Sequence, residues 1–191
     1  SKDFREIIYT YNSTYALNLL TQTLRYNKFL KAWDKVLLSI TEHHANIVPW
    51  LILKNEIWIE IDFVNIDDNY QIDFEDFSKK LTPNVKVVSF TQVSNVTWSI
   101  FDLEKIGEMI KNLYLSSNKG PHPSPLPRGE GINKPLFIVD ASQSVPHFKI
   151  DVEKLKADFV FFTGHKIMAD SGIWVLWWKK ELLEILNPVF S

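Results

Sequence analysis

A carboxylate and a lysine each follow a short apolar run in the second half of the sequence. Asp140 ends the run that begins at Phe137, and Lys166 follows the run 159–162 after Thr163, Gly164 and His165. Buried parallel strands present polar side chains at their carboxyl ends, so we expect both groups at one edge of a sheet. There a lysine can form a Schiff base and an acid can keep a pyridinium nitrogen protonated, which suits pyridoxal 5′-phosphate (PLP). Taken singly, Asp140 could instead cap a turn and Lys166 could be a solvated loop residue.

The elements that would position these groups alternate along the chain between strand-like and helix-like patterns. Apolar spacing predicts helices at 13–27, 45–54, 73–81, 102–113 and 179–186, a helical turn at 152–156, and strands at 35–40, 57–61, 85–90, 136–139, 158–162 and 173–178. Strands separated by helices of this length predict an α/β fold with a mainly parallel sheet flanked by helices.

One segment interrupts this alternation. Residues 116–135 hold five of the nine prolines and three of the six glycines, without apolar periodicity. Connections longer than roughly 12–15 residues are uncommon in compact domains, so we predict a disordered Pro/Gly-rich insertion at the surface. A proline-rich recognition motif is the alternative.

Composition narrows the classes of function. The 191 residues fit a single domain, and a net charge of -2 gives no reason to expect nucleic acid or an anionic membrane as a partner. No apolar run reaches transmembrane length and no signal peptide opens the chain, so a cytoplasmic protein is expected. The absence of cysteine excludes a thiolate metal site or a cysteine nucleophile within these residues. Phosphate-binding glycine motifs, H-E-x-x-H and G-x-S-x-G are also missing, and no metal site is expected.

Two motifs around the acid and the lysine resemble the class V aminotransferase family of PLP enzymes. "V-D-x-x-Q" matches residues 139–143, and "[ST]-G-H-K" matches residues 163–166. The nonapeptide 42–50 and the segment 91–96 are similar to the "E-H-H-[AS]-N-x-x-P-W" and "T-H-V-S-N-V" of the SufS-like (group II) cysteine desulfurase branch. The resemblance extends from about Phe4 to Leu186, apart from the insertion.

The resemblance implies a role for each matching residue. Lys166 would carry PLP, His43 would stack on its ring and take part in proton transfer, and Asp140 would hold the pyridinium nitrogen. The remaining cofactor contacts would be Asn95 and Gln143 to the phenolic oxygen, and Ser13, Thr14, Thr163 and His165 to the phosphate. Ser13 and Thr14 also open a predicted helix, where free N–H groups attract an anion or simply receive an N-cap. The chain departs from the family at Asn12, Tyr15, Gln92 and the 169–171 segment.

The resemblance further implies the fold type I large domain of a PLP-dependent transferase over residues 1–191, without the N-terminal segment and the smaller C-terminal domain of the family. The implied activity is that of a cysteine desulfurase, which converts L-cysteine to L-alanine and an enzyme-bound persulfide for iron–sulfur cluster assembly. A homodimer and a sulfur-acceptor protein are the expected partners. Another class V activity (selenocysteine lyase, aminotransferase or an epimerase-like reaction) and a truncated, non-catalytic scaffold remain alternatives.

Overall fold

A single mixed sheet forms the centre of the molecule in the computed structural model, which describes residues 3–117, 134–169, 173–187 and 189. Within these residues the strand order is β1-β7-β6-β5-β4-β2-β3. The strands are β1 (Ile7–Thr10), β2 (Lys35–Ser39), β3 (Glu60–Val64), β4 (Val85–Thr91), β5 (Leu136–Asp140), β6 (Phe159–Thr163) and β7 (Trp174–Trp178). Strands β3, β2, β4, β5 and β6 are parallel to one another. Because β7 is antiparallel to both of its neighbours, β1 runs in the same direction as β6.

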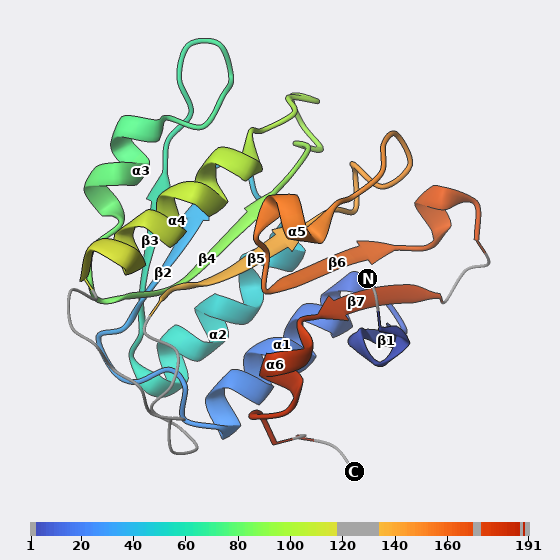
Figure 1. The fold of residues 1–191 in the computed structure, drawn as a ribbon, viewed down its shortest axis with the longest axis horizontal. Helices are drawn as coiled ribbons and strands as arrows, with labels where there is room; N and C mark the ends of the chain where they lie inside the picture. Colours follow the sequence, from blue (N-terminus) through green and yellow to red (C-terminus); the bar gives the residue numbers. More distant parts are fainter. Residues whose placement is uncertain (1–2, 118–133, 170–172, 188, 190–191) are drawn as a thin grey trace.

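Helices cover both faces of the sheet (Figure 1). On one face lie α1 (Ser13–Tyr26), α2 (Val48–Ile57) and α6 (Lys180–Leu183), and on the other lie α3 (Phe74–Lys80), α4 (Leu103–Ser117) and α5 (Val152–Leu155). Three short 3-10 turns, η1 (Phe4–Glu6), η2 (His44–Asn46) and η3 (His165–Ile167), complete the described elements. The α/β prediction with a mainly parallel sheet is confirmed; among the described strands, β7 alone runs against the others, in its pairings with β1 and β6.

The central strands are apolar without interruption because both of their faces are buried. In β5, Phe137 and Val139 pack against the α3–α4–α5 layer, whereas Leu136 and Ile138 pack against the α1–α2–α6 layer. All four side chains are fully buried. This alternation explains why the sequence shows a continuous apolar run here rather than the period of two that a half-exposed strand shows.

Some predicted boundaries were wrong. The predicted helix 45–54 is the 3-10 turn η2 followed by α2, which begins at Val48 with Pro49 in its first turn. The predicted strand 57–61 starts later, at Glu60, because α2 continues to Ile57 and ends at Trp58. Trp58 is left-handed (φ 65°) and donates its N–H to the Lys54 carbonyl, which closes the helix.

The bounds of the predicted insertion and of the last predicted helix also differ from those in the structure. Helix α4 continues to Ser117, two residues into the segment predicted to be disordered, and residues 118–133 lie outside the described residues. Lys134 forms an ion pair with Asp158 just before β5 begins. The predicted helix 179–186 is the single turn α6. None of the described helices is long and apolar enough to cross a membrane.

Candidate cofactor site

Six of the described strands run in the same direction, so their carboxyl ends lie at one edge of the sheet. Asp140 pairs with Thr91 of β4 on one side and with Phe161 of β6 on the other. Thr10 at the end of β1 and Thr163 at the end of β6 both pair with Trp174, so these two strands end at the same level. The segments that carry all of the predicted site residues leave the sheet from this edge, as they do in other open α/β sheets that bind ligands.

Asp140 is the buried acid of this edge. Its side chain is 5% exposed, and its Oδ1 accepts the backbone N–H of Ser142 at 2.9 Å. Burial raises the pKa of Asp140, while hydrogen bonding from Ser142 and the positive charges of Lys166 and His43 act in the opposite direction. Asp140 at the end of β5 and Lys166 in the turn after the neighbouring β6 thus stand at the same edge of the sheet.

Lys166 lies in η3, directly after β6, and its side chain is half-buried. Burial lowers the pKa of the Lys166 ammonium group, and the negative charge of Asp140 opposes that change. A lowered pKa increases the fraction of neutral amine, which is the form that attacks an aldehyde.

Gly164 sets the position of the turn that carries Lys166. A Cβ on Gly164 would stand 2.1 Å from the carbonyl oxygen of Ile173, a distance that side chains do not tolerate. The same carbonyl accepts the Gly164 N–H at 2.9 Å. Beside it, the Thr163 hydroxyl and His165 Nδ1 form a hydrogen bond of 2.6 Å, and the His165 ring lies 5.1 Å from that of Trp174. The residues predicted to bind the cofactor phosphate from this side thus form one connected group.

His43 follows the end of β2 and is exposed. Its Nδ1 accepts the backbone N–H of Ala45 at 3.1 Å, so the neutral ring carries its proton on Nε2. The centre of the His44 ring lies 6.3 Å from that of His43, and the two ring planes make an angle of 66°. No group of three or more His, Asp or Glu side chains in the described ranges could hold a metal ion.

The other predicted contacts lie at the same edge. Ser13 and Thr14 occupy the first turn of α1, where Asn12 is the N-cap and accepts the Tyr15 N–H at 2.6 Å. Asn95 stands in the turn after β4 and Gln143 in the turn after β5, both half-buried.

Two polar residues of the edge received no role from the sequence. Gln92 follows β4, and its buried Oε1 has no hydrogen-bond partner among the described residues. Glu42 is buried, and burial raises its pKa to about 7. Both residues lie inside the motifs at 42–50 and 91–96, but the type of a polar residue does not show by itself whether its side chain is buried. A buried acid and a half-buried lysine at the ends of neighbouring strands fit the ring nitrogen and the aldehyde of PLP.

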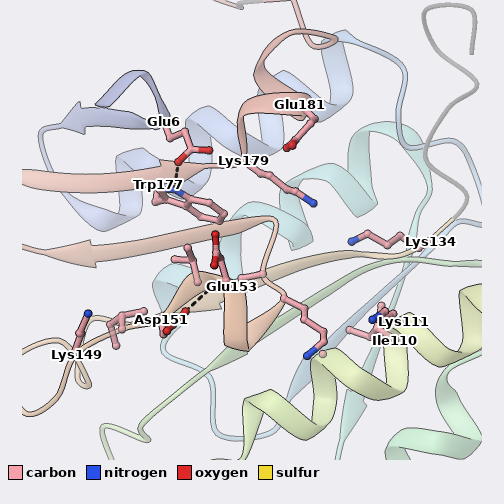
Figure 2. A pocket seen from close by; sticks show the side chains of 15 residues that line it. Glu6, Ile110, Lys111, Lys134, Lys149, Asp151, Glu153, Trp177, Lys179 and Glu181 are labelled. Carbon is pink, nitrogen blue, oxygen red and sulfur yellow. Dashed lines mark hydrogen bonds between the residues drawn. The ribbon is translucent and has the colours of Figure 1, made fainter. Parts of the chain in front are cut away.

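A separate pocket of about 820 Å³ opens at the opposite end of the sheet (Figure 2). Lys134 precedes β5 and Lys179 follows the antiparallel β7, which places the pocket at the amino ends of the parallel strands. Both lysines and acids line it. The Trp177 indole N–H donates to Glu6 Oε2 at 3.0 Å, the dashed line in Figure 2. None of the residues predicted for the PLP site lines this pocket.

Comparisons with known proteins identify the family of this chain and agree with its fold. The aminotransferase class-V profile matches residues 1–115 and 131–191, and the chain belongs to this family. A "probable cysteine desulfurase" of Pyrococcus abyssi is 35% identical over 97% of this chain and 41% of its own length. Another from Synechocystis is 32% identical over 98% of this chain and 40% of its own length.

Solved structures show the same similarity. The apo cysteine desulfurase of Thermococcus onnurineus superposes with a TM-score of 0.82 at 32% identity, over 99% of this chain and 42% of that one. The cysteine desulfurase CsdA of Escherichia coli gives a TM-score of 0.81 at 28% identity, over 99% of this chain and 42% of that one. The chain thus spans about 40% of the length of these relatives. The family profile leaves out residues 116–130, which lie within the predicted insertion.

Proposed function

We propose that the chain forms the PLP-binding part of a cysteine desulfurase, with Lys166 as the cofactor lysine and Asp140 as the partner of the pyridinium nitrogen. The observation that carries this proposal is the placement of the two groups: Asp140 ends β5 and pairs with Phe161 of the neighbouring β6, and Lys166 lies in the turn that follows β6. PLP bound there would supply an electron sink for the substrate's α-carbon. The cysteine desulfurases among its relatives support the choice of reaction.

The environment of Lys166 favours the form of the amine that this role needs. A lysine at its reference pKa is neutral in only about one molecule in a few thousand at pH 7. Burial lowers the pKa of Lys166 and so enlarges that fraction. Burial disfavours the ionised form of the Asp140 carboxyl group. A cationic ring nitrogen beside it would offset this effect, because an opposite charge favours the ionised carboxylate.

The remaining residues would hold the cofactor and move a proton. Ser13, Thr14, Thr163 and His165 are proposed to bind the phosphate, supported by the equal level at which β1 and β6 end. The first turn of α1 adds backbone N–H groups that favour an anion. Asn95 and Gln143 are proposed to bind the phenolic oxygen, and His43 to cover the ring and transfer protons through Nε2.

The sulfur step requires a group that these residues lack. Conversion of L-cysteine to L-alanine transfers the substrate sulfur to a cysteine thiolate, which becomes a persulfide, while the carbon left behind gains a proton. The 191 residues contain no cysteine, so in this proposal the thiolate comes from elsewhere. A homodimer, a cytoplasmic location and a sulfur-acceptor protein for iron–sulfur cluster assembly belong to the same proposal.

Adding amino acids to the PLP-loaded chain tests this function. L-Cysteine is expected to change the visible absorbance of the bound cofactor, because the substrate amine competes with Lys166 for it. No sulfide or persulfide should form, since the attacking cysteine is missing. Sulfur release by these 191 residues would refute the claim that the attacking thiolate comes from elsewhere. A spectrum that does not change when L-cysteine is added would refute the substrate assignment.

A further inference from the structure

Glu42 lies at the centre of a buried hydrogen-bond network next to the candidate site. The Ser39 hydroxyl donates to its Oε1 at 2.5 Å, and the Thr91 backbone N–H donates to the same oxygen at 2.9 Å. The Asn46 amide donates to Oε2 at 2.7 Å. These donors come from the end of β2, the end of β4 and the turn η2, so one carboxyl group joins three separate parts of the edge.

Asn46 extends this network to the neighbouring strand. Its Oδ1 accepts the Ser89 hydroxyl of β4 at 2.7 Å, and both side chains are fully buried. Buried polar groups that are all bonded hold one arrangement, because losing any partner leaves an unpaired group in a dry interior. Hydrogen bonds of side chains therefore hold the β2–η2 connection against β4, in addition to the backbone pairing of β2 with β4.

This hydrogen-bond network fixes the backbone on both sides of His43, which directly follows Glu42. Thr91, whose backbone N–H donates to Glu42, pairs in the sheet with Asp140, so the network ends beside the buried acid of the site. An apolar residue in place of Glu42 would leave the Thr91 N–H without an acceptor, while Ser39 and Asn46 would keep only Thr41 and Ser89 as partners. The side-chain bonds between the turn and β4 would be fewer, and the turn would be free to move.

We propose that Glu42 is a positioning residue of the cofactor site: by joining β2, η2 and β4, it fixes the turn that carries His43 at the edge where Asp140 ends its strand. The part that concerns PLP rests on the proposed function. The placement of His43 does not, because it is a property of the chain without a ligand.

Glutamine is the conservative replacement at this position. Its carbonyl oxygen can receive the Ser39 and Thr91 donors as Oε1 does now. Its amide would face that of Asn46, which can turn over, accept from the glutamine and donate to the Ser89 hydroxyl. Glu42→Gln therefore keeps the network, whereas Glu42→Ala removes it.

Two readouts test the proposal: the NMR signals of the His43 imidazole in the ligand-free chain, and the Kd for PLP. Glu42→Ala is expected to shift the His43 signals and to raise the Kd by about tenfold or more, since small misplacements of positioned groups are costly. Glu42→Gln should restore both to near the parent values. Asp158→Ala is the matched control, because Asp158 is also buried and accepts a backbone N–H, from Phe137 at 2.9 Å, at the other end of the sheet.

The control should lower stability and leave both readouts unchanged. Equal effects of Glu42→Ala and Asp158→Ala would overturn the proposal, as would unchanged His43 signals in a folded Glu42→Ala variant. Should that variant not fold, Ser39→Ala decides, because it removes one donor and must still move the His43 signals. If the parent chain does not bind PLP, the proposed function fails, while the His43 signals still decide this inference.

Discussion

Replacing Glu42 with glutamine should change how the stability of the ligand-free chain depends on pH. Burial is the main cause that raises the pKa of Glu42 from 4.5 to about 7, and the charge of Asp140 adds to it. Hydrogen bonds from Ser39, Thr91 and Asn46 lower the pKa but do not cancel this rise. The folded state therefore holds its proton more tightly than the unfolded state does.

The sign of the effect follows from this difference. Below pH 4.5 both states are protonated, and the contribution of Glu42 to stability is fully present. As the pH rises toward 7 the unfolded state loses its proton first, so stability falls. At 1.36 kcal/mol for each pKa unit, the rise from 4.5 to about 7 corresponds to a loss of roughly 3 kcal/mol. Glutamine does not titrate, so Glu42→Gln should not show this loss.

Urea unfolding followed by tryptophan fluorescence, at several pH values from 4.5 to 7.5, measures the difference. Relative to Glu42→Gln, the parent chain should lose about 3 kcal/mol across this range. Glu108→Gln is the control, because the hydrogen bond from Lys156 lowers the pKa of Glu108 and its contribution is lost only as the pH falls below 4.5. Parallel profiles for the parent and Glu42→Gln would refute the reasoning about the buried carboxyl.

Three further predictions concern the cofactor edge and the insertion. Asp140→Asn should stabilise the ligand-free chain at pH 7, because burial raises the pKa of Asp140, yet weaken PLP binding by about tenfold or more; tighter binding would contradict its role. Gly164→Ala should displace Lys166 and reduce PLP labelling of the folded protein, whereas Gly107→Ala, with a similar overlap against Leu155, should only lower the melting temperature. Replacing 118–133 with a short Gly/Ser link should leave the melting temperature unchanged or slightly raised; a large loss would show that the segment packs.

Much of the fold could be predicted because the central strands are apolar on both faces. In β5 and β6 the run ends in polar residues at the carboxyl edge, and that pattern alone indicated both Asp140 and Lys166. Strand β1 was missed because its four residues are too few to show a periodic pattern. Its place in the sheet depends on pairing with β7, where Ile7 lies opposite Trp177, and the two segments are far apart in the sequence.

The network around Glu42 was beyond sequence reasoning for the same reason. An acid before two histidines is typical of an exposed turn, and only the fold shows that η2 packs onto the end of β4. The contact with Thr91 spans 49 positions of sequence. The end of α2 was misplaced because a left-handed tryptophan at Trp58 closes it, a conformation for which glycine is the usual signal.

Covalent labelling of the chain tests the central claim most directly. After incubation with PLP and reduction with borohydride, peptide mass spectrometry should find the cofactor on Lys166. Lys166→Ala should abolish the visible absorbance band and the label, whereas Lys149→Ala, at an exposed lysine of the opposite pocket, should leave both unchanged. A label that settles mainly on another lysine, or that persists at the parent level in Lys166→Ala, would contradict the assignment of the cofactor site.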